Sequence, residues 1–103
     1  MTKVSIKKKD NKVYEIVIKG HSKYEEYGKD IVCASISTMA ITTINSILCL
    51  EDNTIEYEEK TGLLKISVLK DTEVVNKLLD NLIIQLEELH DMYPKNIEIR
   101  NEE

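Results

Sequence analysis

The sequence predicts a single α+β domain with the element order β-β-α-β-β-α-β, in which two helices pack on one mixed or antiparallel sheet. Two pairs of short segments alternate apolar with polar residues around turn residues, as β-hairpins do. Two longer segments carry apolar residues at helical spacing. The chain has 103 residues, enough for one small core and not for two, so we expect residues 1–103 to form one domain.

Each predicted hairpin joins two alternating runs through a short turn, Asp10-Asn11 in the first and Lys60-Thr61-Gly62 in the second. A last short strand is expected near Ile97 and Ile99. Since the chain has no Trp and no Phe, its large core residues must be Ile, Leu, Val, Met and some of the five Tyr. The alternating residues of the four hairpin strands are Val4, Ile6, Tyr14, Ile16, Ile18, Ile55, Tyr57, Leu64, Ile66 and Val68.

The first predicted helix, from about Asp30 to Leu50, is apolar almost throughout. Such a helix must be covered on several sides, so we expect it to lie across the sheet and to meet a second element or another subunit. Asp30 is its predicted N-cap, because a carboxylate can accept a free N–H of the first turn. The second helix, from about Thr72 to Met92, is amphipathic, and Pro94 follows its end.

Charge and hydropathy exclude several classes of protein. The net charge of -5 argues against direct binding to nucleic acid, which is itself a polyanion. Residues 1–10 are alternating and rich in Lys, unlike a secretory signal, and no apolar run reaches the roughly 18 residues of a membrane span. We therefore expect a cytoplasmic protein with reduced thiols and no membrane partner.

The two cysteines, Cys33 and Cys49, lie 16 positions apart. Cys33 is expected in the first turn of the helix, where the positive end of the helix dipole favours a thiolate. Cys49 lies near the other helix end among apolar residues and is expected to be inert. From the pattern alone, the more common role of a lone cysteine among apolar residues is that of a small buried hydrophobe.

His21 lies in a segment without apolar periodicity, bounded by Gly20 and Gly28. A loop leading into the helix could fold over the helix start and bring the imidazole to the thiol of Cys33, where it would serve acyl transfer as base and acid. A solvated histidine is the alternative. The two glycines could be hinges, or could simply end a strand and precede a helix.

Asp30, Cys33 and Ser37 occupy one helix face, at positions i, i+3 and i+7. Asp30 could cap the helix or orient His21, and Ser37 could bind substrate or bond back to its own helix. We expect no metal site. The two cysteines with His21 and His90 match no zinc-ligand spacing, and the cysteines lie more than about four helical turns apart.

One stretch carries a recognisable motif. Gly20-His21-Ser22 is followed by Tyr27-Gly28-Lys29-Asp30-Ile31-Val32-Cys33-Ala34, and then by Ser37. This pattern resembles that of the ribosomal-processing cysteine protease family, which is Gly-His-small, a short loop, Gly-x-Asp-x-x-Cys-Ala, and a Ser three residues beyond the Ala. Ser22 stands where the family usually has Ala, a mild departure.

The resemblance implies an enzyme with a Cys-His dyad, in which Cys33 is the nucleophile and His21 the base, with Asp30 and Ser37 near the site. It implies a cytoplasmic homodimer that needs no cofactor and removes a short N-terminal extension from ribosomal protein twenty-seven of the large subunit. Tyr24 and Tyr27 would pack on the substrate or anchor the loop.

Two alternatives to this enzyme remain. One is a non-catalytic ribosome-associated binding module, in which Cys33 is only part of the core. The other is a redox-sensing thiol protein, which is less favoured because no resolving cysteine lies near Cys33 in the sequence.

Overall fold

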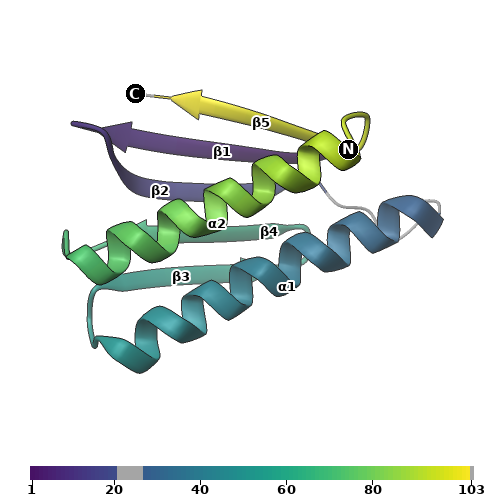
Figure 1. The fold of residues 1–103 in the computed structure, drawn as a ribbon. Coiled ribbons are helices and arrows are strands. Elements are labelled where there is room, and N and C mark those ends of the chain that lie inside the picture. The colour runs from purple at the N-terminus through teal and green to yellow at the C-terminus, as the bar shows by residue number, and fades with distance from the viewer. Residues whose placement is uncertain (21–26, 103) are drawn as a thin grey trace.

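The computed structural model describes the backbone of residues 1–20 and 27–102 and the side chains of residues 1–20 and 31–102. Its elements confirm the α+β class and the predicted order (Figure 1). They are β1 (Thr2–Lys9), β2 (Lys12–Lys19), α1 (Tyr27–Leu50), β3 (Ile55–Lys60), β4 (Leu63–Val68), α2 (Glu73–Met92) and β5 (Ile97–Glu102).

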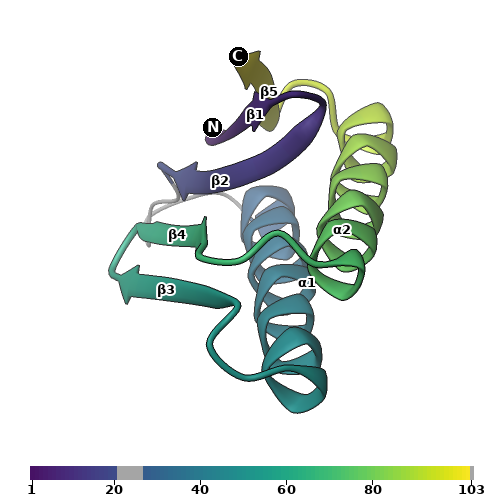
Figure 2. The same cartoon turned by 90° about the vertical axis from the view of Figure 1, so that its left-hand side faces the viewer.

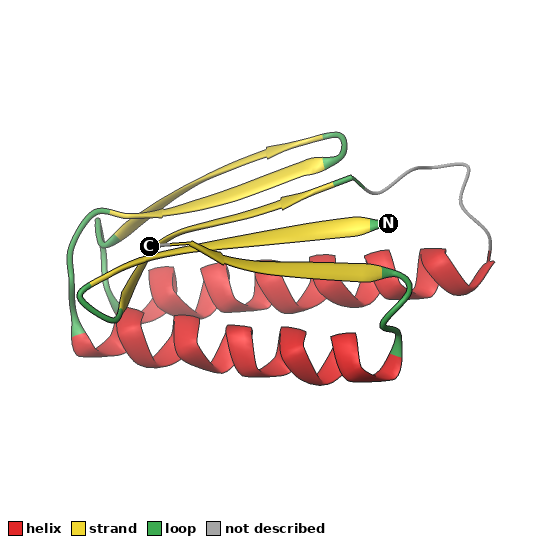
Figure 3. Cartoon of the chain, turned by 90° about the horizontal axis from the view of Figure 1, so that it is seen from above, coloured by secondary structure: helices red, strands yellow, loops and turns green. Residues whose placement is uncertain are grey.

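The five strands form one mixed sheet in the order β3-β4-β2-β1-β5. The pairs β1–β2, β2–β4 and β3–β4 are antiparallel, as the two hairpins require, whereas β1 and β5 are parallel. Both helices lie on the same face of the sheet, side by side along the strands (Figures 2 and 3). The N-terminal strand β1 is therefore held between two neighbours, and its first residue lies close to the start of α1.

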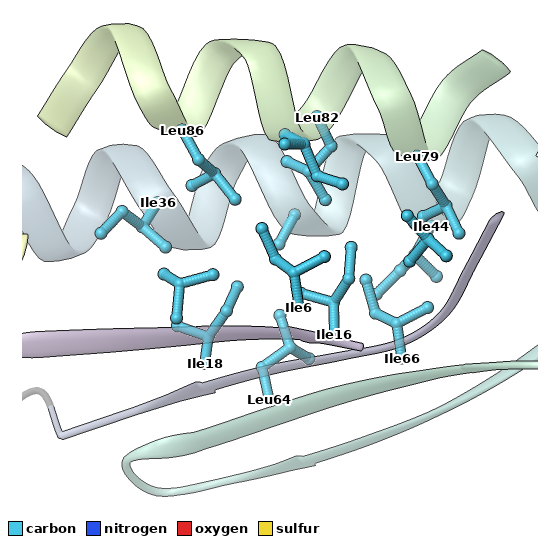
Figure 4. Packing of buried hydrophobic residues seen from close by; sticks show 14 of the residues in the cluster. Ile6, Ile16, Ile18, Ile36, Ile44, Leu64, Ile66, Leu79, Leu82 and Leu86 are labelled. Carbon is cyan, nitrogen blue, oxygen red and sulfur yellow. The ribbon is translucent and has the colours of Figure 1, made fainter. Parts of the chain in front are cut away.

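The core fills the space between the helices and the covered face of the sheet (Figure 4). It is built from aliphatic side chains, and each fully buried one contributes about 1.5–3 kcal/mol. The largest fully buried side chains are Ile6, Ile16, Ile36, Ile44, Ile47, Ile66, Leu79, Leu82, Leu86, Ile97, Val4 and Val32. None of the tyrosines belongs to the buried core of the described side chains, although Tyr93 packs against it.

Two tyrosines of the alternating runs are exposed, Tyr14 by 43% and Tyr57 by 50%. Tyr14 lies at an irregularity of the β1–β2 ladder, where Lys7 pairs with Glu15 but Lys8 pairs with Val13. The extra residue in β2 shifts the alternation by one, so Val13 is buried where the period pointed to Tyr14. Tyr57 lies on β3 at the edge of the sheet, where cover is incomplete.

Helix α1 begins at Tyr27, three residues earlier than expected, so Asp30 is its fourth residue and not its N-cap. The segment Ile31–Leu50 of α1 is long and apolar enough, by length and composition, to span a membrane. The sequence did not predict such a span, because its apolar runs are interrupted. Core helices of soluble proteins pass the same test. One side of α1 packs on the sheet and on α2, and it carries the buried residues Val32, Ile36, Ala40, Ile44 and Ile47.

Candidate active site

Cys33 lies at the end of the fold where β1 begins. It is the seventh residue of α1 and is half-buried. Its Sγ is 3.4 Å from Oγ1 of Thr2, a hydrogen bond between side chains 31 positions apart. Thr2 is only 2% exposed. The sulfur is thus held at the surface of the core, with one face against a strand.

Gly20 completes this end of the fold. Its φ of +92° is rare for residues with a side chain, and a Cβ on it would lie 2.9 Å from the carbonyl oxygen of Met1. Its N–H donates to the carbonyl oxygen of Gly62 over 3.2 Å. Only glycine therefore fits between the start of β1 and the β3–β4 turn, and the chain that leads to His21 leaves from this point.

The predicted base falls outside the described residues, as do Ser22 and Tyr24. Tyr27, Gly28 and Asp30 are described by their backbone only and lie in the first turn of α1. Gly28 is thus inside the helix rather than before it. The pairing of His21 with Cys33 and the hinge role of Gly28 stay predictions.

The start of α1 at Tyr27 changes the electrostatic argument for Cys33. The unpaired N–H groups of a helix belong to its first four residues, here residues 27–30, and the effect of the dipole fades within the first turn. Cys33 lies in the second turn and so receives less help from the helix start than a first-turn position would give. Any stabilisation of its thiolate must come mainly from side chains around it.

Ser37 lies one turn beyond Cys33 and is exposed. Three other hydroxyls of α1 bond back to the carbonyl four residues earlier: Ser35 to Ile31, Thr43 to Met39 and Ser46 to Thr42. Among the side-chain hydrogen bonds between described residues, none involves Ser37. Both predicted roles of Ser37 stay predictions.

Cys49 is exposed, so the expectation of a cysteine packed among apolar neighbours is wrong. The last turns of α1 are partly uncovered, and Leu48 and Leu50, on different sides of the helix, are 36% and 64% exposed. With Thr42, Asn45, Ser46 and Leu50, Cys49 lines a shallow hollow on one uncovered flank. Within residues 1–20 and 31–102, no three His, Cys, Asp or Glu side chains gather where they could hold a metal ion.

Thr2 was not singled out from the sequence, although one signal was present. It shares the phase of Val4 and Ile6 in the first alternating run, so it is a polar residue at a position whose neighbours are buried. A buried hydroxyl needs a partner, and here that partner is the sulfur of Cys33.

Comparison with known proteins decides the family. Residues 1–98 match the family model described as cysteine protease Prp. This chain belongs to that family. The ribosomal processing cysteine protease Prp of Staphylococcus aureus is 31% identical over 93 residues, which cover 87% of this chain and 88% of that protein. The Mycoplasma genitalium Prp is 30% identical over 89 residues, covering 84% of this chain and 87% of that protein.

A solved structure is also similar over the whole length. It is the essential ribosomal processing protease Prp from S. aureus in complex with a covalently linked product peptide. Its TM-score with this chain is 0.89 at 25% identity, and the match covers 99% of this chain and 100% of that one. As a member of the Prp family, this chain is a cysteine protease of ribosomal processing, which favours the enzyme over the non-catalytic module.

Proposed function

We propose that this chain is the endopeptidase that removes a short N-terminal extension from large-subunit ribosomal protein twenty-seven, with Cys33 as nucleophile and His21 as base. The observation that carries the proposal is the match of the Gly20–Ser37 motif within a chain of the Prp family, because Cys33 is the one cysteine of that motif. The covalently linked product peptide of the S. aureus relative supports a covalent mechanism.

The proposed chemistry is acyl transfer in two halves. His21 takes the proton of Cys33, and the thiolate attacks the scissile carbonyl to give a tetrahedral oxyanion. The carbon–nitrogen bond then breaks, the imidazolium gives its proton to the leaving amine, and the N-terminal segment remains as a thioester on Cys33. His21 next deprotonates a water, which hydrolyses the thioester and restores the thiol.

Backbone donors for the oxyanion are the unpaired N–H groups of residues 27–30 at the start of α1. They precede Cys33 by three to six positions. Helix side chains tilt toward the N-terminus, so the sulfur lies over the preceding turn, on the side of these donors. Because α1 begins at Tyr27, these N–H donors lie in the turn before Cys33 and not in the turn that holds it.

The supporting residues have narrower roles than the sequence alone allowed. Because α1 begins before Asp30, the capping role no longer applies, and orientation of His21 is the role that we propose for its carboxylate. Ser37 is exposed and makes no side-chain hydrogen bond to another described residue, and it is proposed to contact substrate. Gly20 and Gly28 are proposed to set the ends of the segment that carries the base.

We further propose that the protein works as a homodimer in the cytoplasm, where its ribosomal substrate is made. Exposed aliphatic side chains along α1 support dimerisation, because Ile31, Leu48 and Leu50 are 44%, 36% and 64% exposed. Exposed aliphatic side chains on one helix favour burial against a second copy. Sedimentation at micromolar concentration tests this. Replacing Leu50 by Glu should yield monomers, and a monomeric parent would refute the proposal.

The substrate is tested with two peptides made from the N-terminus of protein twenty-seven of the same genome. One carries the native sequence through the extension and the other a scrambled extension of the same composition. We expect cleavage of the native peptide only, measured by mass spectrometry. If the genome encodes protein twenty-seven without an extension, or if both peptides are cleaved equally, the substrate assignment fails.

A further inference from the structure

The hydroxyl of Thr2 has an unusual environment for a strand residue. Its side chain is 2% exposed at the first position of β1, and its only hydrogen-bond partner among the described residues is Sγ of Cys33. Val would fill the same volume without a polar group. Burying a hydroxyl is unfavourable unless it is bonded, so packing alone would be served better by Val.

The backbone holds this hydroxyl in place. The N–H of Thr2 donates to the carbonyl oxygen of Asn96 over 2.9 Å, and Thr2 pairs in register with Ile97 of the parallel strand β5. Strand β1 is flanked by β2 on its other side. A β-branched side chain has few χ1 rotamers, so Oγ1 is presented to the sulfur by a rigid support.

The direction of the bond follows from the charge of the sulfur. A neutral thiol can donate its proton to Oγ1 or accept one from it, but a thiolate can only accept. Once Cys33 loses its proton, the hydroxyl of Thr2 must therefore be the donor. A hydrogen bond to the charged form of an acid favours ionisation. Among the described side chains, the hydroxyl of Thr2 is the one that lies within hydrogen-bond distance of the sulfur.

We propose that Thr2 is a positioning residue for the nucleophile: its hydroxyl donates to the Cys33 thiolate, favours its formation and fixes the sulfur for attack. This rests on the proposed role of Cys33 in catalysis. It adds a residue 31 positions away, outside the motif that spans Gly20 to Ser37.

The structure offers a matched control. Thr54 is the other buried threonine among the described residues, 3% exposed, and its Oγ1 has no hydrogen-bond partner there. It precedes β3 and lies beyond the far end of α1 from Cys33. Thr54→Val makes the same chemical change as Thr2→Val without touching the sulfur.

The test measures the alkylation rate of Cys33 by iodoacetamide as a function of pH, without substrate. All variants carry Cys49→Ala, because Cys49 is exposed and would also react. Thr2→Val should slow the alkylation of Cys33 several-fold near neutral pH, because the thiolate loses this hydrogen-bond donor. Thr2→Ser should keep the profile of the parent, and Thr54→Val should leave it unchanged.

The second measurement is the rate at which the variants cleave the substrate peptide. Thr2→Val should lower kcat with little change in KM, since the hydroxyl contacts the sulfur and not the peptide. If the pH profile of Thr2→Val equals that of Thr54→Val, the proposal is wrong. If the Val variant does not fold, Thr2→Ala takes its place in both assays and is judged in the same way. Failure of the proposed function is distinct, because it shows as cleavage by Cys33→Ala.

Discussion

The two cysteines of α1 differ in their surroundings far more than in their sequence neighbours. Each is flanked by aliphatic residues, Val32 beside Cys33 and Leu48 and Leu50 near Cys49. Yet Cys33 is half-buried against β1 and hydrogen-bonded to Thr2, whereas Cys49 is exposed on an uncovered flank. What separates a candidate nucleophile from an ordinary surface thiol is therefore tertiary packing at one end of the helix.

The largest expected effect separates the two cysteines directly. Cys33→Ala should lower the cleavage rate of the substrate peptide by on the order of 10⁴-fold or more, because the covalent step is lost. Cys49→Ala should cleave at the rate of the parent. By circular dichroism, Cys49→Ala should melt at nearly the temperature of the parent, and Cys33→Ala should melt slightly lower because the buried hydroxyl of Thr2 loses the sulfur as its partner. Loss of cleavage in the Cys49 variant instead would reverse the comparison.

Core truncations distinguish the two ends of α1 by activity rather than by stability. Ile36 and Ile44 are each 1% exposed, and they lie three residues after Cys33 and five residues before Cys49 respectively. Replacing either by Ala should cost about 2–5 kcal/mol in urea unfolding. Only Ile36→Ala should also lower kcat at temperatures where both variants are folded. Equal kcat in the two variants would mean that the packing beneath Cys33 does not position the sulfur.

Substitutions of Gly20 and Gly28 test how the backbone supports the site. Gly20→Val should cost roughly 1–3 kcal/mol, because the residue has a positive φ and its Cβ would meet Met1. Displacing Met1 should disturb Thr2 and reduce cleavage further. Gly28→Ala, inside α1, should be neutral or stabilising by about 0.5–1 kcal/mol. Urea midpoints and peptide cleavage measured on both variants check this, and a fully active Gly20→Val enzyme would contradict it.

The smallest effect on stability is expected from a substitution of Asp71, near the end of α1 that carries Cys49. Hydrogen bonds from Lys12 and Asn76 lower the pKa of Asp71 below its ordinary value. A carboxyl with a lowered folded-state pKa adds stability above its unfolded-state value, near pH 3.9, and loses it as pH falls through the folded-state pKa. Asp71→Asn should therefore unfold slightly more easily than the parent at pH 7, with the difference vanishing near pH 2.

Urea midpoints at the two pH values check the Asp71 prediction, and the alkylation profile of Cys33 should not change. Since Asp71 is fully exposed, solvent screens its interactions and the effect stays small. A shift in the Cys33 profile would mean that the two ends of α1 are coupled, against the account given above.

The sequence predicted the architecture well because its signals were local. Alternation marks the hairpins, and helical spacing marks α1 and α2. The bulge at Tyr14 was missed because one extra residue shifts the alternation without any mark of its own. The exposure of Cys49 was missed because an almost wholly apolar helix does not indicate which side is covered.

The site was predictable only in part, because some of its contacts join residues that are distant in the sequence. Cys33 could be selected because the motif fixes its spacing to Gly20 and Asp30. The contact with Thr2 could not, since it joins residues 31 positions apart through the packing of β1 against α1. The start of α1 at Tyr27 was also missed, because the glycine at position 28 suggested a loop rather than a first helical turn.

The most direct test of the central claim is to trap the acyl-enzyme. The protein is mixed with the native substrate peptide, quenched in acid within the first turnover, and digested for mass spectrometry. The account predicts the mass of the N-terminal segment on Cys33 as a thioester, none on Cys49, and no adduct in the Cys33→Ala variant. Turnover of the peptide by that variant, or an adduct on Cys49, would contradict it.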